Sequence, residues 1–395
     1  MKKILLGTTT LIGAVALASA ASAATPKVTL GGFVDFQAGI MNDDLDANQR
    51  NHAFRNDTEI SVKVDGKTDS GLGYGGEVWL EADVEGPSAG ISDARNQGVN
   101  ASKTFTYLEG NWGRAEMGSN VGPDATMKVD ASTIARATGG IDGSFDYFSN
   151  AATIYLARPD LPMNYGLTSG VAGNFLGNED QENATKLTYY TPRWNGLQAG
   201  ISYAPADTDR GQLIARADNT AAITVGAAGD TFTVSQAEGI WQGGLSWEGN
   251  FQNFGIALAA TGEAGNAELA THEDLRAWAL GGSVSYMGFS LAGSYGDWSD
   301  SLRLNTANTD DNDYWTVGGA YEHGPFGVSV TYIKSNMELT STTDNEFDNL
   351  VVGVDYKMAP GFTPYLEASF YEQDANTLAN DNDGSVFIAG TLLSF

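Results

Sequence analysis

The residues that could carry out chemistry are few and scattered along the chain. There is no cysteine, and the three histidines, His52, His272 and His323, lie in or beside different expected connections. His272-Glu273 has no second histidine at the spacing of a zinc-protease helix. Acyl or phosphoryl chemistry requires a nucleophile beside a base. The sequence therefore indicates no enzyme.

Two further patterns could bind a ligand. Gly71-Leu72-Gly73-Tyr74-Gly75-Gly76 matches G-x-G-x-x-G, but it lies between a tight turn and an alternating strand with no helix behind it, so dinucleotide binding is not expected. Asn380–Gly384 and Asp310–Asp313 are rich in the hard oxygen ligands that calcium prefers. We expect no cofactor and no metal, with a structural calcium between acidic loops as the alternative.

Composition and charge exclude several classes of protein. The 395 residues include 49 acidic and 21 basic residues, for a formal net charge of −28. Phosphate contacts need clustered Lys and Arg, so no nucleic-acid partner is expected. Without cysteine, a disulfide scaffold and a thiolate metal site are both excluded. Disorder is not indicated, because 42% of the residues are hydrophobic.

The first 23 residues have the features of a secretory signal peptide. A positive start, Met1-Lys2-Lys3, precedes an apolar stretch from Ile4 to Ala18, and Ala21-Ser22-Ala23 is an A-x-A cleavage signature. A membrane anchor is the alternative, but the apolar stretch is short for one. We expect residues 1–23 to be removed on export and residues 24–395 to form a single domain.

The mature chain alternates apolar and polar residues with a period of two, which is typical of β-strands. In the segment 28–42, Val34 and Phe36 share one face, while Asp35 and Gln37 share the other. No later stretch approaches the ~20 apolar residues of a membrane helix. If the chain spans a membrane, it must do so as a closed β-barrel, because open sheet edges cannot face lipid.

The alternation predicts sixteen strands, and an even number places both chain ends on one side of a bacterial barrel. Very short turns, such as Asp69-Ser70-Gly71, alternate with long polar connections, such as 206–237. This asymmetry is typical of outer-membrane barrels, and the alternative of a secreted β-sandwich does not explain it. The expected strands are 28–42, 55–68, 72–84, 102–110, 113–118, 184–191, 197–205, 239–252, 254–263, 274–287, 289–298, 313–323, 326–335, 348–358, 362–373 and 385–395.

Aromatic residues cluster near the expected strand ends, including Trp194, Trp247, Trp278 and Trp315. On the outer face of a barrel they would form the girdles that lie at the two membrane interfaces.

The third long connection is different from the others. Residues 119–183 show no sustained alternation, and this length far exceeds the ~12–15 residues at which a structureless loop becomes unusual. We expect an all-β protein, a 16-stranded antiparallel transmembrane β-barrel whose long third loop folds inward. The alternative makes Thr153–Ala157 and Tyr165–Val171 an extra hairpin, with Pro159 and Pro162 in its turn, and gives eighteen strands.

Several segments carry a resemblance to a known family. They are 28–33 (VTLGGF), 106–118 (TYLEGNWGRAEMG), 187–197 (LTYYTPRWNGL) and the last strand, 385–395, which ends in Phe395. With the signal peptide and the strand count, the chain resembles Gram-negative general diffusion porins, most of all those of alphaproteobacteria. The acidic loop tip facing an arginine ladder that is usual in the family is not obvious in this sequence.

The resemblance implies a location and a set of partners. It implies a homotrimer in the cell outer membrane, in contact with lipid and lipopolysaccharide, with Phe395 as the signal read by the barrel assembly machinery. It also implies a water-filled channel for passive diffusion of ions and small hydrophilic solutes. A substrate-selective channel for sugars or other small polar solutes is the alternative.

Charge at the narrowest part of such a channel would bias which ions pass. We expect a negative side on the third loop, at Asp124, Asp130, Asp142 and Asp146. We expect a positive side on inward-facing wall residues, at Arg55, Lys63, Arg114 and Lys186. A solvated charge at a loop base is the alternative for each of these residues.

Overall fold

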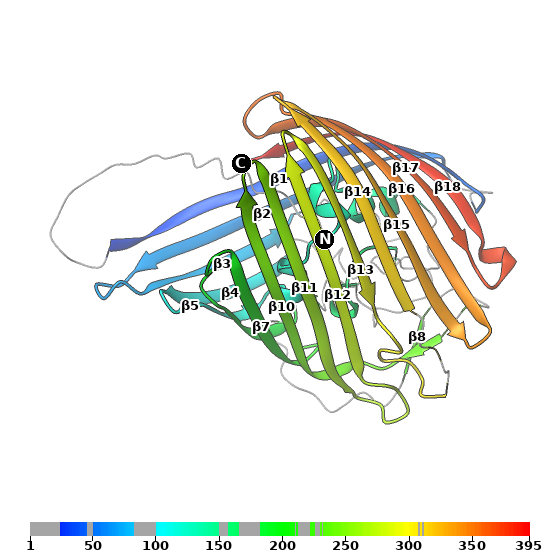
Figure 1. Ribbon diagram of the computed structural model, residues 1–395, viewed down its shortest axis with the longest axis horizontal. Helices are drawn as coiled ribbons and strands as arrows, with labels where there is room; N and C mark the ends of the chain where they lie inside the picture. The colour runs from blue at the N-terminus through cyan, green and yellow to red at the C-terminus, as the bar shows by residue number, and fades with distance from the viewer. Residues whose placement is uncertain are drawn as a thin grey trace.

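The chain folds into one closed antiparallel β-barrel (Figure 1). The computed structural model describes residues 24–45, 50–82, 100–149, 157–165, 182–209, 211, 222–225, 230, 232–306, 309 and 312–395. The barrel order in these ranges is β1-β18-β17-β16-β15-β14-β13-β12-β11-β10-β7-β6-β5-β4-β3-β2, and β8 and β9 form a separate two-stranded sheet. Within the same ranges, no helix is long and apolar enough to cross a membrane.

The strands of the barrel are long. Their bounds are β1 Ala24–Asp43, β2 His52–Lys67, β3 Gly73–Glu81, β4 Asn100–Gly110, β5 Gly113–Ser119, β6 Thr185–Tyr190, β7 Leu197–Ala206, β10 Ala237–Phe251, β11 Phe254–Ala267, β12 Leu275–Tyr286, β13 Phe289–Asp297, β14 Asn312–His323, β15 Phe326–Thr340, β16 Thr343–Tyr356, β17 Phe362–Asp374 and β18 Asn382–Ser394. The small sheet is formed by β8 Ile223–Val225 and β9 Phe232–Val234, and η4 is Leu378–Asn380.

The prediction of sixteen barrel strands is confirmed. The eighteen-strand alternative is wrong, because β5 pairs directly with β6, from Arg114 opposite Tyr190 to Ser119 opposite Thr185, which leaves no place for two strands between them. Most of the two segments proposed for that hairpin lies outside the described residues. So does the expected signal peptide, residues 1–23, and β1 begins at Ala24.

Pairing of the first strand with the last closes the barrel. The β1–β18 ladder runs from Phe33 opposite Ser394 to Asp43 opposite Gly384. Beyond it, the backbone amide of Phe395 donates to the carbonyl of Gly32 at 3.0 Å, and the amide of Gly32 donates back at 3.1 Å. Closure leaves no open sheet edge, so every strand has a partner on both sides.

The two faces of the barrel follow the alternation of the strands. On β1, Val34 and Phe36 are exposed on the outer face, whereas Asp35 and Gln37 are buried on the inner face. Outer aromatic side chains pair across neighbouring strands near both ends of the barrel. The pairs near the long connections are Tyr203–Trp241, Trp278–Tyr295 and Trp315–Tyr332, and those near the short turns are Phe254–Tyr286 and Phe289–Tyr321. They form the two aromatic girdles that the sequence predicts.

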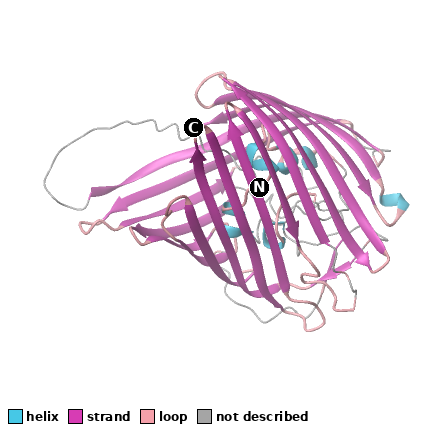
Figure 2. Cartoon of the chain, in the orientation of Figure 1, coloured by secondary structure: helices cyan, strands magenta, loops and turns pink. Residues whose placement is uncertain are grey.

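The third long loop, L3, comprises residues 120–184, and its described parts, 120–149, 157–165 and 182–184, fold into the barrel. Its helical turns are α1 Pro123–Thr126, η1 Ala131–Ile134, η2 Gly140–Asp142, η3 Phe145–Tyr147 and α2 Pro162–Tyr165. Figure 2 shows short helices surrounded by the strands. Contacts place α1 against β7, β10 and β11, η1 against β13, β14 and β15, and η2 against β15 and β16. L3 therefore lies along one part of the inner wall.

Glycines on the inner wall make room for L3. A Cβ on Gly281 of β12 would lie 1.6 Å from the carbonyl oxygen of Val129, and one on Gly244 of β10 would lie 2.7 Å from that of Pro123. A Cβ on Gly353 of β16 would lie 2.8 Å from the carbonyl oxygen of Arg136. Backbone oxygens cannot move aside as the end of a flexible side chain can. The close approach of loop to wall therefore requires these glycines.

Hydrogen bonds and apolar packing fix the loop against the same wall. The amide of Arg136 donates to Ser329 Oγ at 2.8 Å, and Thr138 Oγ1 donates to Glu367 Oε1 at 2.6 Å. Beside them, the ring of Phe145 stacks on Phe347 with 6.5 Å between centroids. The apolar cluster around this pair includes Ile141, Phe148, Ile333, Val351 and Ile388. Loop position is thus set by both polar and apolar contacts.

Gly281→Ala tests whether L3 needs a glycine at this position of the inner wall. We expect the added methyl to displace L3 and to destabilise the protein by about 1–3 kcal/mol, the usual cost of overpacking. The measurement is thermal unfolding in detergent, followed by circular dichroism. Gly243→Ala is the matched control, because a Cβ there would have its nearest neighbour, the carbonyl oxygen of Gly200, at 4.0 Å. Equal unfolding midpoints for both variants would contradict this role of Gly281.

Candidate functional site

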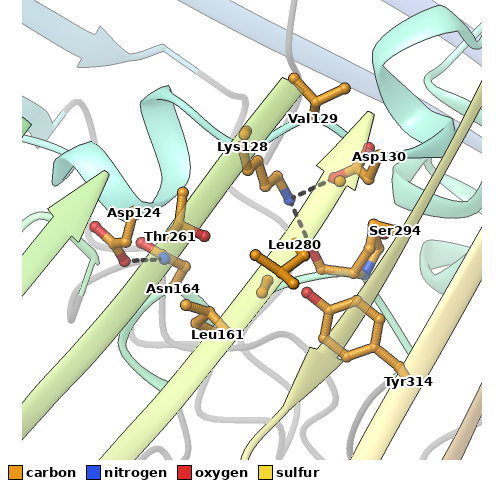
Figure 3. Close-up of a pocket in the computed structure, with 14 residues that line it drawn as sticks. Asp124, Lys128, Val129, Asp130, Leu161, Asn164, Thr261, Leu280, Ser294 and Tyr314 are labelled. Atoms are coloured by element: carbon orange, nitrogen blue, oxygen red, sulfur yellow. Dashed lines mark hydrogen bonds and ion pairs between the residues drawn. The ribbon is translucent and has the colours of Figure 1, made fainter. Parts of the chain in front are cut away.

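Lys128 joins the two legs of L3. Its ammonium donates to the carbonyl oxygen of Pro159 at 2.9 Å and to the carboxylate of Asp160 on the return leg. On the outgoing leg it lies 3.5 Å from Asp130 and 3.7 Å from Asp142. Figure 3 shows Lys128 reaching toward Asp130 beside a small cavity of about 10 Å³, which is room for about one water.

Arg158 is the second cation of this cluster. The guanidinium of Arg158 binds the carboxylate of Asp146 and lies 3.7 Å from Asp142. The buried group thus has two cations and four carboxylates, at Lys128, Arg158, Asp130, Asp142, Asp146 and Asp160.

The pKa values in the cluster follow from this excess of acid. Burial alone would lower the pKa of Lys128, but Asp160, Asp142 and Asp130 outweigh it and hold that pKa well above its usual range. Burial alone would raise the pKa of Asp160, but Lys128 outweighs it and the pKa is lowered. The pKa of Asp142 is raised, because burial exceeds the attraction of Lys128 and Arg158. Lys128 therefore pairs with the ionised carboxylate of Asp160. Asp142 is the carboxylate that the two cations of the cluster do not fully stabilise in its charged form.

Asp124 belongs to a second buried group, between α1 and the wall. Asp124 Oδ2 accepts from Asn164 Nδ2 at 2.5 Å, a contact drawn in Figure 3, and from Gln242 Nε2 of β10 at 3.0 Å. Lys186 of β6 donates to Gln242 Oε1 at 2.7 Å and to the carbonyl oxygen of Glu182 at 2.8 Å. The structure therefore brings Asp124 and Lys186 into one hydrogen-bonded group through Gln242.

The inner face of β2–β5 carries cations that alternate with acids. Arg55 lies 3.1 Å from Asp57 of the same strand, and Lys63 lies 3.5 Å from Asp65. On β5, Nε of Arg114 donates to Glu116 at 2.6 Å. Each pair is two residues apart, so both members face the lumen. These cations are neutralised by acids on the wall itself.

Aromatic rings hold these cations in place. Cζ of Arg114 lies 3.8 Å from the ring centroid of Tyr107, and Nζ of Lys63 lies 5.8 Å from it. Cζ of Arg55 lies 3.5 Å from the ring of Tyr147, which belongs to L3. Such cation–π contacts stabilise a charge that is partly removed from water. Arg55 is also the point where L3 meets β2.

Exposure distinguishes the two parts of the inner wall. Inner residues of β14–β17, such as Thr331, Asn349 and Ser369, are at most 1% exposed. On β2 and β3, the inner residues from Glu59 to Asp65 and from Gly75 to Glu81 are all half-buried. An inner residue of a closed barrel can reach solvent only through the lumen, so open space borders the inner wall of β2 and β3. On β4 and β5 the inner residues Lys103, Glu109 and Arg114 also reach solvent, whereas Phe105, Tyr107 and Glu116 are buried.

The predicted site residues therefore fall into three groups. The loop acids Asp124, Asp130 and Asp142 are buried within L3 or between L3 and the wall, and Asp146 is half-buried. Their role at a constriction stays a prediction. Arg55, Lys63 and Arg114 face inward from β2 and β5, whereas Lys186 is buried beside L3. Phe395 closes the barrel through its backbone, and its side chain is exposed.

The calcium alternative is not decided by the structure. Among the described residues, no three or more His, Asp or Glu side chains are arranged to hold a metal ion. Asp310 and Asp311 lie outside those residues, and Asn380 binds Asp230 instead. A structural calcium stays a prediction.

Sequence reasoning missed the acidic partners on the wall. Asp57, Asp65 and Glu116 each follow a predicted cation by two residues, and that spacing on an alternating strand is a signal of same-face pairing. Asp160 had no such signal, because its contact with Lys128 joins two legs of a loop with no regular period. The glycines of the inner wall that make room for L3 could not be assigned without knowing which strands lie under the loop.

A family model described as Gram-negative porin matches residues 8–376. The chain belongs to the Gram-negative porin family. It is an outer-membrane channel protein that crosses the membrane repeatedly as a β-barrel, and the resemblance seen in the sequence is confirmed.

Individual relatives agree with this assignment. An uncharacterized protein of Rickettsia felis is 25% identical over 428 aligned positions, which cover 93% of each chain. Outer membrane porin protein 32 of Delftia acidovorans is 29% identical over 258 positions, 62% of this chain and 65% of the relative.

Two solved structures share the fold. An anion-selective porin from Comamonas acidovorans superposes with a TM-score of 0.60 at 18% identity, over 94% of this chain and 100% of that one. A mutant of Rh. blastica porin gives a TM-score of 0.57 at 13% identity, over 93% and 100% of the two chains.

Paired amide substitutions test the buried cluster. Asp160→Asn leaves Lys128 without its hydrogen-bonded anion, and we expect a loss of about 3 kcal/mol at pH 7. Asp142→Asn removes the carboxylate in excess, so we expect no loss of stability, or a gain. The measurements are thermal unfolding in detergent and the rate of trypsin cleavage after Lys128.

The same substitutions should differ in their pH dependence. The lowered pKa of Asp160 stabilises the fold above the ordinary value of 3.8, and this stabilisation is lost as pH falls through the lowered pKa. The raised pKa of Asp142 has the opposite sign, so ionised Asp142 destabilises the fold as pH rises above 3.8. Equal losses in the two variants at pH 7 would contradict these assignments.

Proposed function

We propose that this porin is a general diffusion channel whose aqueous path runs between L3 and the inner wall of β2–β5. The observation that supports this path is the difference in exposure between the half-buried inner residues of β2 and β3 and the fully buried ones of β14–β17. L3 occupies the other side of the lumen and narrows it. Arg55, where L3 meets β2, marks one edge of the narrow region.

The lining of this path suits small hydrophilic solutes. Its inner residues on β2 and β5 are mostly charged, and each cation lies near an acid. Charged and polar walls keep the hole filled with water, whereas an apolar constriction would close it by dewetting. The substrate-selective alternative would require a built binding site for one solute. The work of such a channel involves no reaction, since it consists of holding a water-filled passage open.

We also propose that three copies associate through the outer face of β2–β4. Elsewhere the outer face carries aromatic pairs, from Tyr203–Trp241 on β7 and β10 to Phe370–Phe387 on β17 and β18. On β2–β4, apart from Asn56 and from Phe54, which pairs with Phe36 of β1, the outer residues toward the long-loop end are aliphatic or small: Thr58, Ile60, Val62, Val78, Leu80, Thr104 and Thr106. A face with so few aromatic residues suits contact with protein better than contact with lipid headgroups. The remaining outer surface would contact outer-membrane lipid and lipopolysaccharide.

Reconstitution in a planar bilayer tests the channel function. We expect the mature protein to produce large conductance steps that grow in proportion to salt concentration, as a water-filled passage should. A homotrimer should close in three equal substeps. The control is the same preparation after boiling, which unfolds the barrel and changes its migration on a gel. A silent membrane with correctly folded protein would contradict the proposal.

Phe395→Ala tests the proposed recognition by the barrel assembly machinery. The closing hydrogen bonds between Phe395 and Gly32 involve only backbone atoms. We therefore expect the purified variant, refolded in detergent, to match the wild type in thermal stability, while its yield in the outer membrane of cells falls severalfold. A normal cellular yield would show that the side chain is not the signal.

A further inference from the structure

In the described parts of L3, residues 120–149, 157–165 and 182–184, the charged side chains are largely enclosed and offer the lumen little free charge. Lys128 and Arg158 bind the carboxylates of Asp130, Asp146 and Asp160 within the loop. Asp130 and Asp160 are buried, and Asp146 is half-buried. Arg136, the other cation of the described loop, binds Glu322 and lies 3.7 Å from Asp355, on β14 and β16. These described charges of L3 are therefore poorly placed to select ions.

The inner wall of β2–β5 carries more acid than base. The strand register places seven acids and five cations on this face, an excess of two negative charges. The acids are Asp57, Glu59, Asp65, Glu77, Glu81, Glu109 and Glu116, and the cations are Arg55, Lys63, Lys67, Lys103 and Arg114. Asp57 and Glu116 are buried against Arg55 and Arg114, which they neutralise. The other five acids are half-buried or exposed and meet water, as the 43% exposure of the Asp65 side chain illustrates.

Glu77 lies at the centre of this wall. It is half-buried on β3, with Lys63 opposite on β2 and Phe105 opposite on β4. Its Oε1 accepts a hydrogen bond from Nε1 of Trp79 at 2.5 Å, which fixes the carboxylate against the wall. Lys63 is itself paired with Asp65 at 3.5 Å. A fixed carboxylate whose cross-strand cation has a second acid beside it can attract a passing cation.

We propose that the channel prefers cations and that the β2–β5 wall, with Glu77 as a specificity-determining residue, sets this preference instead of the acids of L3. The inference rests on the proposed channel function. Its physical basis is that the excess acid of the wall borders water, whereas the excess acid of L3 is enclosed in protein and Asp142 is disposed to take up a proton. Small inorganic cations and solutes bearing an ammonium group are the favoured classes.

The reversal potential of single channels in a KCl gradient tests the proposal. A unit charge about 6 Å from the path of an ion in water changes the local concentration of that ion about threefold. We expect a potassium-to-chloride permeability ratio above one for the wild type. Glu77→Gln should lower the ratio about two- to threefold, and Lys63→Gln should raise it by a similar factor. Both shifts should shrink in 1 M salt, where charges are screened within about 3 Å.

A matched control and a rival variant sharpen the test. Glu346→Gln makes the same chemical change on the outer face of β16, where Glu346 binds Lys334 at 2.7 Å, and it should leave the ratio unchanged. Asp142→Asn is the rival, because it removes charge from L3. A larger shift from Asp142→Asn than from Glu77→Gln would overturn the proposal, as would an open channel that prefers chloride. Folded protein without any conductance would instead overturn the channel function itself.

Discussion

Backbone hydrogen bonding in hydrocarbon is the constraint on which the rest of this structure depends. No water is present in the bilayer core to satisfy amide and carbonyl groups, so every strand must have a neighbour on both sides. The ladder between β1 and β18, completed by the backbone bonds between Gly32 and Phe395, meets that requirement. Closure creates an inner face that lipid never reaches. Charged residues can lie there only because the ring is complete.

Inside the ring, the placement of L3 decides how the lumen is divided. Glycines on β10, β12 and β16 let the backbone of the loop approach the wall, where Ser329 and Glu367 bind it. Lys128 then joins the two legs of the loop. The side of the barrel under L3 becomes a packed core, and the opposite side remains wet. One loop thus forms a core and, in the channel we propose, also narrows the lumen.

The same division explains why like residues have different roles. Asp142 and Glu77 are both carboxylates inside the barrel, yet one is enclosed beside Lys128 and Arg158 and the other borders the lumen. An enclosed charge affects the stability of the loop, because its solvation is lost. A charge beside water affects the ions that pass. Charge composition alone does not separate these two roles.

The sequence by itself determined the barrel. A period of two over sixteen long segments specifies which residues face lipid, and short turns that alternate with long loops specify the topology. The positions of Arg55, Lys63 and Arg114 on the inner face could be predicted in the same way. These are local properties, since each strand carries its own alternation.

Only the tertiary structure decided which partners the site residues have. The pairing of Lys128 with Asp160 joins loop segments about thirty residues apart. The need for a glycine at position 281 depends on where the backbone of Val129 lies. L3 has no sequence period that could predict such contacts. Its path is the outcome of packing against many strands at once, and that is a property of the folded barrel.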